Sequence, residues 1–409
     1  MISVAIMGHG VVGSGVAEIL TTHKQKLFAS IGEEIYVKHI LDLREFPDSP
    51  LADRFTKDFN DILNDREVRV VVEVMGGLNP AYAFVKKCLK SGKSVVTSNK
   101  ELVAAHGAEL LQIAKDENVN FLFEASVGGG IPIIRPISQC LVANIVDEIA
   151  GILNGTTNFI LTKMIEDGMQ FDAALKLAQD LGFAERNPAA DIEGHDACRK
   201  ICILASLAFG KHVYPKSVHT EGITEITLED VKYAEAYNCV IKLIGRVKRL
   251  DDGKIDIIVA PMFVPNKSQL ANIDYEFNGI MVRGDCTGDV VFYGKGAGKL
   301  PTASAVVADV VDCCKHLKTR KFLFWADGNG DNILPYEESI TAMYIRANTT
   351  FELAQEVFGC IDKIEKADSP EGEIAFVTAQ LPYGEIIEKI AALESRGAKV
   401  ISKIRIGDL

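Results

Sequence analysis

The stretch ISVAIMGHGVVG at residues 2–13 joins a short apolar run to a glycine-rich turn, and a helical pattern follows at residues 14–20. Strand, G-x-G-x-x-G and helix, in this order, form the context in which the motif binds the pyrophosphate of a dinucleotide. Gly8 and Gly10 allow a tight turn with close backbone approach, and Gly13 lets the helix pack on the strand. The alternative is a glycine turn that binds nothing. The stretch favours a dinucleotide-binding fold at the start of the chain.

Strands and helices alternate from this turn to about residue 125. Apolar, β-branched strand patterns lie at residues 35–41, 68–74, 94–97 and 120–124, and helical patterns lie at residues 79–89 and 102–115. This alternation predicts a doubly wound parallel sheet, a Rossmann-type α/β fold. Ligands of such sheets bind beyond the carboxyl ends of the strands. The residues expected at that edge are Gly76, Gly77, Asn99, Lys100 and Glu124.

The end of the second predicted strand bears on the choice of cofactor. Asp42 stands where an acid commonly binds the ribose 2′-hydroxyl of NAD. Arg44 and Lys57, close by in the sequence, could instead pair with the 2′-phosphate of NADP. Because residues of both types are present, the pattern leaves the two cofactors open.

A second polar segment, DIEGHDACRK at residues 191–200, runs into an apolar helix at residues 201–209. Asp196 and Lys200 are four residues apart and share one helical face, which is also the spacing of an ordinary surface ion pair. The helix that follows is apolar on all sides and therefore buried, so charges at its start need a partner or a chemical role. With Glu185 just upstream, the segment is a candidate substrate site.

Two further loops are unusual in composition. The run NGTTN at residues 154–158 suits either the binding of a small polar substrate or the capping of the helix that follows it. The run EASVGGGIP at residues 124–132 is either a flexible crossover or a loop whose carbonyl oxygens, together with Glu124, could hold a hard cation.

Composition limits the classes of partner. A chain of 409 residues is too long for one core and suggests two or three domains. The net charge of −12 argues against nucleic acid or an anionic membrane as a partner, and no apolar run reaches membrane-spanning length. Nine cysteines with no C-x-x-C pair indicate a reduced, cytoplasmic protein.

The C-terminal residues 338–409 have the pattern βαββαβ, which predicts a ferredoxin-like sandwich that either senses a ligand or mediates oligomerisation. The expected organisation has four parts. These are a Rossmann domain at residues 1–125 with about 301–317, an α+β catalytic, substrate-binding and dimerisation domain at 126–300, a linker at 318–337 and the C-terminal domain.

Seven motifs follow one another along the chain: GHGVVG (8–13), VVEVMGG (71–77), TSNK (97–100), EASVGGGIP (124–132), LNGTTNFIL (153–161), LGFAERNPAADIEGHDACRK (181–200) and GKGAGKLPTASAVV (294–307). With these motifs the chain resembles the homoserine dehydrogenases over its whole length, and its C-terminal domain is similar to the ACT domain of many members of that family. Seven motifs in the same order are far more specific than the glycine fingerprint alone.

The resemblance implies an NAD(P)-dependent interconversion of L-aspartate 4-semialdehyde and L-homoserine, a step towards threonine, methionine and isoleucine. It also implies a monovalent cation such as Na⁺, a homodimer or homotetramer, and an amino-acid effector such as threonine acting through the C-terminal domain. Removal of the chain beyond about Gly328 is then expected to preserve catalysis and abolish the response to threonine.

Motifs and resemblance together give four sets of candidate residues. Lys200 matches the family's proposed proton donor, and Lys100 matches a second lysine with a catalytic or cofactor-contacting role. The candidate substrate contacts are Glu185, Asp191, Asp196, Lys200, Asn154 and Thr156. The candidate cofactor contacts are Gly8, Gly10, Val11, Val12, Gly13, Asp42, Arg44, Gly76, Ser98, Lys100 and Gly298. The candidate cation loop consists of Glu124, Val127, Gly129 and Ile131. One departure concerns Leu41, because many relatives have Arg immediately before the acid that aligns with Asp42.

The chemistry of an aldehyde reduction fits these residues. It needs a hydride held above one face of the carbonyl group and a proton for the developing alkoxide. Lys200 could supply both the proton and charge stabilisation, while Glu185 and Asp196 could bind a substrate amino group. One alternative is a Rossmann dehydrogenase for another small hydroxy acid. A second is a nucleotide- and amino-acid-sensing regulator without catalysis, against which Lys200 argues because a sensor needs no proton donor.

Overall fold

In the computed structural model, which describes residues 1–409, the apolar segments at the start of the chain form a six-stranded sheet. Its strand order is β3-β2-β1-β4-β5-β6, and all of its neighbouring strands run parallel. The predicted doubly wound sheet is therefore confirmed. The strands are β1 (Ile2–Met7), β2 (Ile35–Leu41), β3 (Phe55–Thr56), β4 (Val68–Glu73), β5 (Ser94–Thr97) and β6 (Phe121–Leu122). β6 is shorter than predicted because a 3₁₀ turn begins at Glu124.

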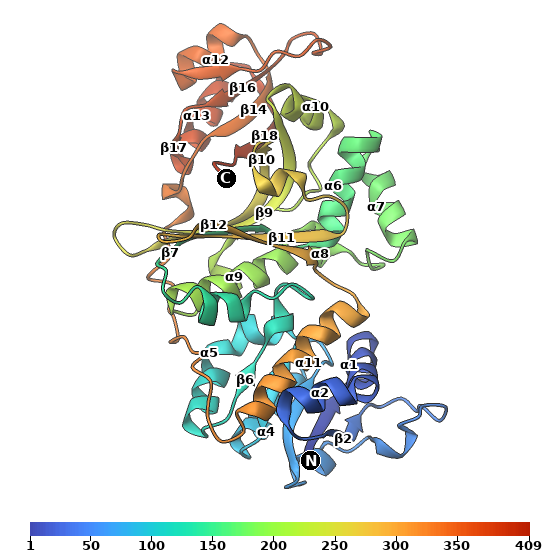
Figure 1. The fold of residues 1–409 in the computed structure, drawn as a ribbon. Helices are drawn as coiled ribbons and strands as arrows, with labels where there is room; N and C mark the ends of the chain where they lie inside the picture. The colour runs from blue at the N-terminus through green and yellow to red at the C-terminus, as the bar shows by residue number, and fades with distance from the viewer. The chain divides into compact units, whose positions relative to one another are not determined.

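Helices from two separate parts of the sequence, residues 11–116 and 299–315, pack around this sheet (Figure 1). They are α1 (Val11–Thr22), α2 (Lys24–Ile31), α3 (Phe59–Leu63), α4 (Ala81–Lys90), α5 (Lys100–Asp116) and α11 (Lys299–Lys315). α11 contacts α1, α2, β4 and β5, so the predicted return of this late helix to the first domain is confirmed. The approach is close, because a Cβ added at Gly15 would lie 3.0 Å from the Cβ of Ala303.

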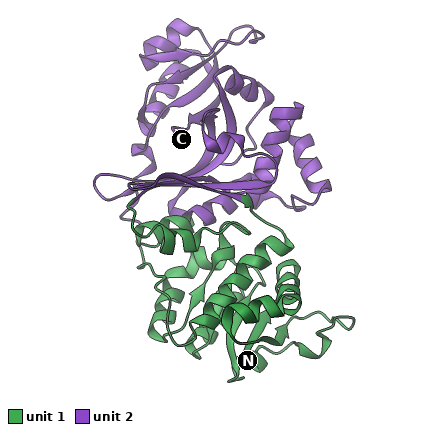
Figure 2. Cartoon of the chain, in the orientation of Figure 1, with its two compact units in different colours: residues 1–145, 202–215, 294–329 green, residues 146–201, 216–293, 330–409 purple.

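The chain divides into two compact units, each built from three separate segments (Figure 2). The first unit comprises residues 1–145, 202–215 and 294–329, and the second comprises residues 146–201, 216–293 and 330–409. The third segment of the first unit is fixed by Trp325, which is buried and donates from Nε1 to His212 Nδ1 at 2.8 Å.

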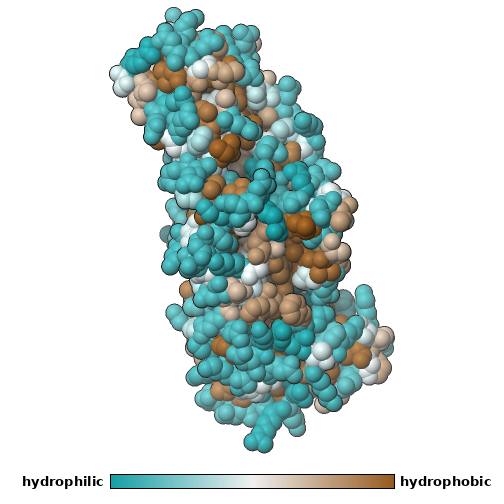
Figure 3. All heavy atoms as spheres, turned by 90° about the vertical axis from the view of Figure 1, so that its left-hand side faces the viewer, coloured by the Kyte–Doolittle hydropathy of each residue, from teal (hydrophilic) through white to brown (hydrophobic).

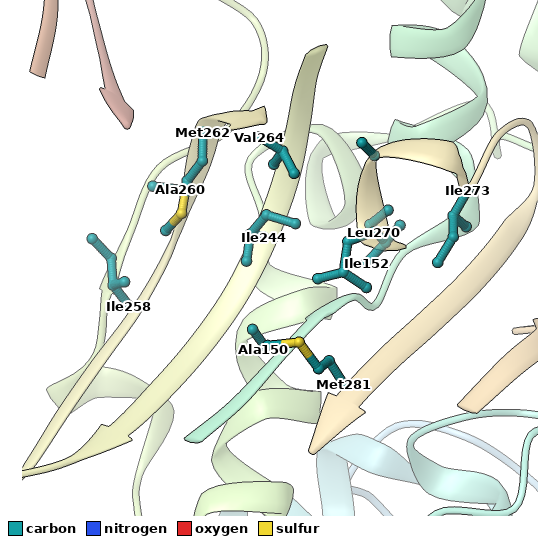
Figure 4. Close-up of a cluster of buried hydrophobic side chains, with 11 residues drawn as sticks. Ala150, Ile152, Ile244, Ile258, Ala260, Met262, Val264, Leu270, Ile273 and Met281 are labelled. Carbon is teal, nitrogen blue, oxygen red and sulfur yellow. The ribbon is translucent and has the colours of Figure 1, made fainter. Parts of the chain in front are cut away.

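The second unit is organised around a ten-stranded sheet of order β12-β11-β7-β9-β10-β18-β14-β16-β15, with β8 paired to β10 beside this path. The strands of its first half are β7 (Val146–Ile152), β8 (His219–Thr220), β9 (Cys239–Arg249), β10 (Ile255–Pro265), β11 (Phe277–Gly284) and β12 (Gly288–Lys295). Apolar side chains from four of these strands form one core cluster, including Ile152, Ile244 and Met281 (Figure 4). The accompanying helices are α6 (Gly155–Asp167), α7 (Phe171–Asp180), α8 (Ala189–Ile192), α9 (His195–Phe209) and α10 (Leu228–Ala236).

The C-terminal part of the second unit has the predicted βαββαβ order. Its elements are β14 (Met343–Asn348), α12 (Phe351–Phe358), β15 (Ile361–Lys363), β16 (Glu373–Thr378), α13 (Tyr383–Ser395) and β18 (Lys399–Ile406). The sheet order β18-β14-β16-β15, antiparallel throughout, is that of a ferredoxin-like sandwich, with a core of its own under α12 and α13. In addition, β18 pairs in parallel with β10, so the sheet of this C-terminal module continues into the sheet that precedes it.

The surface is dominated by polar groups. The face drawn in Figure 3 is mainly hydrophilic and is interrupted by separate apolar patches. None of the helices combines the length and the hydropathy needed to span a lipid bilayer.

Candidate active site

The glycine fingerprint forms the turn between β1 and α1. Gly8 has a φ of +101°, which favours glycine, and a Cβ at Gly13 would lie 1.9 Å from the carbonyl oxygen of Gly8. A Cβ at Gly10, in contrast, would meet no atom within 4 Å. The turn opens on a pocket of about 530 Å³ that is lined by Gly8, Gly10, the end of β2 and the loop after β4, including Gly76. Gly13 therefore serves packing, and Gly10 faces the space available to a ligand.

Asp42 is held at the rim of this pocket by its neighbours. Its carboxylate accepts the backbone N–H of His9 at 2.8 Å and is bound by the guanidinium group of Arg44 at 3.0 and 2.9 Å. The hydrogen bond from Arg44 is the main cause that lowers the pKa of Asp42 well below its usual range. Lys57, which also lines the pocket, pairs with Glu45 at 2.8 Å. The second strand thus presents an ionised acid beside the fingerprint turn.

Glu73, at the end of β4, is a residue of this edge that the sequence motifs did not single out. It is fully buried, accepts the Thr97 hydroxyl at 2.6 Å and accepts the backbone N–H of Met75 at 2.8 Å. Burial raises the pKa of its carboxyl group. A single acid inside the β-branched run VVEV was the available signal, because a carboxylate buried in a strand needs hydrogen-bond partners. It fixes the loop that begins Met75-Gly76.

The other candidates at the carboxyl edge follow β5. Asn99 caps α5 by accepting from the backbone N–H of Leu102 at 3.1 Å, and it donates to the carbonyl oxygen of Gly77 at 2.6 Å. Ser98 and Lys100 flank this cap and are half-buried. The loops after β4 and β5 are therefore joined, as expected for neighbouring parallel strands.

Two glycine-rich segments pack against each other in the first unit. A Cβ at Gly129 would lie 2.1 Å from the carbonyl oxygen of Gly296, and the N–H of Gly130 donates to the carbonyl oxygen of Lys295 at 3.1 Å. Gly298, with a φ of +118°, immediately precedes α11. The predicted cation loop and the predicted Gly298 contact therefore belong to one region.

Glu124 uses its side chain for the backbone of this region. Its carboxylate accepts the N–H groups of Ile133, Ile134 and Arg135 at 2.6, 2.8 and 2.9 Å. No group of three or more His, Cys, Asp or Glu side chains in the chain is arranged to hold a metal ion. Backbone carbonyl oxygens are hard, uncharged ligands, so they remain the candidate donors of the predicted cation loop.

A carboxylate–lysine cluster lies in the second unit, where β7 leads into α6. The Nζ atom of Lys200 lies 2.6 Å from the carbonyl oxygen of Leu153 and 2.9 Å from Asp196 Oδ2. Asn154 Nδ2 donates to Asp191 at 2.7 Å and to Asp196 at 2.9 Å. Lys200 and Asp196 are both buried. The structure thus brings together four of the six predicted substrate residues.

Local sequence explains how these side chains meet. The side chain of Asn154 accepts the N–H of Thr157 and so starts α6, which leaves its NH₂ group pointing at the two aspartates. Gly194, with a φ of +83°, turns the chain between α8, which carries Asp191, and α9, which carries Asp196 and Lys200. Asn154 can therefore cap α6 and take part in the polar cluster at the same time.

Thr156 and Glu185 are placed differently. Thr156 is buried and donates from its hydroxyl to the carbonyl oxygen of Phe183 at 2.7 Å, which supports the segment that leads to Glu185. The side chain of Glu185 is exposed and lies outside the hydrogen-bonded cluster. The cluster can therefore offer a cationic donor next to two carboxylates without Glu185.

Comparisons with known proteins cover nearly the whole chain. The family described as "Homoserine dehydrogenase, NAD binding domain" matches residues 8–124, and the family described as "Homoserine dehydrogenase" matches residues 132–311. A homoserine dehydrogenase of Bacillus subtilis (strain 168) is 38% identical over 93% of this chain and 88% of its own length.

Solved structures agree with these matches. A homoserine dehydrogenase from Thiobacillus denitrificans covers 100% of this chain and 98% of its own, with 36% identity and a TM-score of 0.90. A mutant hyperthermophilic archaeal homoserine dehydrogenase, solved in complex with NADPH, covers 76% of this chain and 97% of its own, with 27% identity and a TM-score of 0.65. The chain, with its dinucleotide-binding sheet and its buried lysine–carboxylate cluster, belongs to the homoserine dehydrogenase family of oxidoreductases.

Proposed function

We propose that the chain catalyses the reversible NAD(P)-dependent reduction of L-aspartate 4-semialdehyde to L-homoserine. The observation that carries this proposal is the buried cluster of Lys200, Asp196 and Asn154, combined with a family match that spans both units. A regulator without catalysis would not need a buried ammonium group beside two carboxylates.

Lys200 is proposed as the proton donor. The bound nicotinamide cofactor supplies the hydride that adds to the aldehyde carbon. As the carbonyl oxygen gains negative charge, the ammonium group of Lys200 stabilises that charge and transfers a proton to it, which gives the alcohol. In the reverse direction the neutral amine accepts the proton of the homoserine hydroxyl group.

Asp191 and Asp196 are proposed to bind the α-ammonium group of the substrate. Asn154 orients both carboxylates through its NH₂ group, and Thr156 supports the segment that carries Glu185, a further candidate contact. Glu185 would have to turn inward on binding, since its side chain is exposed. Lys100, at the start of α5 on the cofactor-binding sheet edge, is proposed as a second functional lysine.

We further propose that NAD is preferred over NADP. Gly8, Gly10, Val11, Val12 and Gly13 would bind the pyrophosphate, with Gly76, Ser98, Lys100 and Gly298 as further contacts. Asp42 offers an ionised carboxylate to the ribose 2′-hydroxyl group and would repel a 2′-phosphate group. Arg44 is already paired with the Asp42 carboxylate and is therefore not available to a 2′-phosphate group. Leu41 in place of the family's frequent Arg acts in the same direction.

Three accessory features are proposed from the family. A monovalent cation such as Na⁺ would be bound by carbonyl oxygens of Glu124, Val127, Gly129 and Ile131. The chain would form a homodimer or homotetramer. An amino acid such as threonine would inhibit it through the ferredoxin-like module. The order of that module's strands and its separate core show the ferredoxin-like fold on which the last of these proposals rests.

The proposal is tested by following absorbance of the reduced nicotinamide while L-homoserine is oxidised, with NAD and NADP in parallel. We expect a homoserine-dependent rise that is larger with NAD. Other small hydroxy acids serve as controls, and oxidation of one of them in preference to homoserine would favour the alternative dehydrogenase. Absence of turnover with every substrate would favour the sensor.

A further inference from the structure

Two strands from distant parts of the sequence share one edge of β10. β8 pairs in parallel with Ile258 and Val259 of β10, and β18 pairs in parallel with Met262 and Phe263. The other edge of β10 is occupied by β9. β8 and β18 therefore lie one after the other along the same edge, and the chain between them contains most of the second unit's sheet.

An ion pair closes the junction between these two strands. Glu221 directly follows β8, and its Oε2 atom lies 2.7 Å from Nη1 of Arg405 in β18. Arg405 is only 4% exposed, and its guanidinium group lies over the rings of Tyr336 and Tyr383. Burial would raise the pKa of Glu221, but a hydrogen bond from His219 and the charge of Arg405 lower it to about 2. The Glu221 carboxylate is therefore ionised, and a residue of the C-terminal module holds it in place.

The backbone around Glu221 also supports the turn that carries the substrate carboxylates. The N–H of Ile223 donates to the carbonyl oxygen of Ile192 at 2.8 Å, and a Cβ at Gly222 would lie 2.2 Å from that same oxygen. A Cβ at Gly194 would lie 2.9 Å from the carbonyl oxygen of Glu221. Ile192 ends α8 and residues 193–194 lead into α9, so Asp191 and Asp196 stand on either side of this contact.

We propose that Arg405, acting through Glu221, is a positioning residue for Asp191 and Asp196, so that the last strand of the chain supports the substrate site. The proposal rests on the substrate role proposed above for these two aspartates. Loss of Arg405 would leave the Glu221 carboxylate partly buried without its countercharge, which favours movement of residues 220–223 towards water. A shift of the turn at Gly194 would then misplace the two carboxylates, and small misplacements are costly for binding and catalysis.

The experiment compares Arg405→Met, Arg405→Lys and Glu221→Gln in the full-length enzyme by steady-state kinetics. Arg405→Met should raise the KM for homoserine about fivefold or more and leave the KM for the cofactor within about twofold. Arg405→Lys should recover most of the loss, because it restores the charge. The double variant with Glu221→Gln should be no worse than Arg405→Met alone, since both changes remove one interaction.

A matched control exists in the same module. Arg346 in β14 is also buried, and its Nε atom pairs with Asp230 Oδ1 at 3.0 Å, which joins the module to α10 instead of the substrate segment. Arg346→Met should lower the melting temperature without changing the KM for homoserine. Hydrogen exchange of residues 189–196 should become faster in Arg405→Met and not in Arg346→Met.

Two results would overturn the proposal. One is a folded Arg405→Met enzyme with unchanged homoserine KM and unchanged exchange at residues 189–196. The other is an equal rise of KM in both arginine variants, which would indicate general loss of stability. If the unaltered enzyme does not oxidise homoserine, the proposed function fails instead, and hydrogen exchange still decides whether Arg405 fixes the turn.

Discussion

At the scale of single residues, Lys200 is surrounded by groups that fix its ammonium nitrogen, with the carbonyl oxygen of Leu153 at 2.6 Å and Asp196 at 2.9 Å. Lys200→Ala should lower kcat by about 10² to 10⁴ because the general acid is lost. Lys200→Arg should recover little, since a guanidinium group hardly releases its proton. Kinetics with homoserine, together with a cofactor titration to confirm that binding persists, measure the effect. Activity of Lys200→Ala within about threefold of the unaltered enzyme would remove this residue from its role.

Asp42 supplies the second prediction at this scale. Asp42→Ala should reduce the ratio of kcat/KM for NAD to that for NADP by about tenfold or more, because it removes a negative charge and releases Arg44. Asp53→Ala is the matched control, since Asp53 is an exposed carboxylate of the same region whose partner Arg54 does not line the pocket. It should change the ratio little. An unchanged ratio in Asp42→Ala would mean that this acid does not select the cofactor.

At the scale of elements, the fingerprint turn allows two glycines to be separated by function. Gly10→Val should raise the dissociation constant of the cofactor while the melting temperature changes little, because a Cβ there meets no atom within 4 Å. Gly13→Ala should lower the melting temperature, because its Cβ would lie 1.9 Å from the Gly8 carbonyl oxygen. Cofactor titration and thermal unfolding of both variants measure the two effects. The reverse pattern would show that the open space at Gly10 is not the cofactor site.

The junction of β8 and β18 gives a prediction on pH. The pKa of Glu221 is lowered to about 2 in the folded protein from the usual 4.5 of a glutamate side chain. A carboxyl group whose pKa is lower in the folded than in the unfolded chain stabilises the fold at pH values above its unfolded-state pKa. This stabilisation is lost as the pH falls through the folded-state pKa. Chemical unfolding should therefore show that the stability difference between the unaltered enzyme and Glu221→Gln shrinks between about pH 4.5 and 2. A difference independent of pH in this range would contradict the ionised pair.

Local sequence patterns predict most of the strands and helices, but they predict few of the contacts between residues that are far apart in the sequence. The fingerprint turn, the strands β1, β2, β4 and β5 and the cap at Asn154 follow from neighbouring residues, whereas the two-residue strand β3 was not predicted. The meeting of Asn154 with Asp191 and Asp196 depends on separations of 37 and 42 residues, which no local pattern encodes. The pairing of β18 with β10 was missed because ladder hydrogen bonds are made by the backbone, so an edge strand does not identify its partner.

At the scale of the whole molecule, the C-terminal module is joined to the rest of the second unit more firmly than the sequence suggested. Truncation near Gly328 would remove the β18 partner of β10, the Arg405 partner of Glu221 and the Asp408 partner of Arg246. We now expect the truncated chain to have a lower melting temperature and a raised KM for homoserine, in addition to any loss of threonine sensitivity. Thermal unfolding and kinetics of the truncated and full-length chains test this. A truncated enzyme with full stability and unchanged KM would mean that the module supports neither the fold nor the substrate site of the rest of the chain.

The shared edge of β10 also sets an order for synthesis. β10 is an apolar strand that is synthesised well before residues 399–406, so part of its hydrogen-bonding edge has no native partner until those residues are made. An unpaired apolar edge is a template for pairing with other chains. The second unit therefore cannot complete its sheet before residues 399–406 have been made, and until then this part of the β10 edge is open to pairing with other chains.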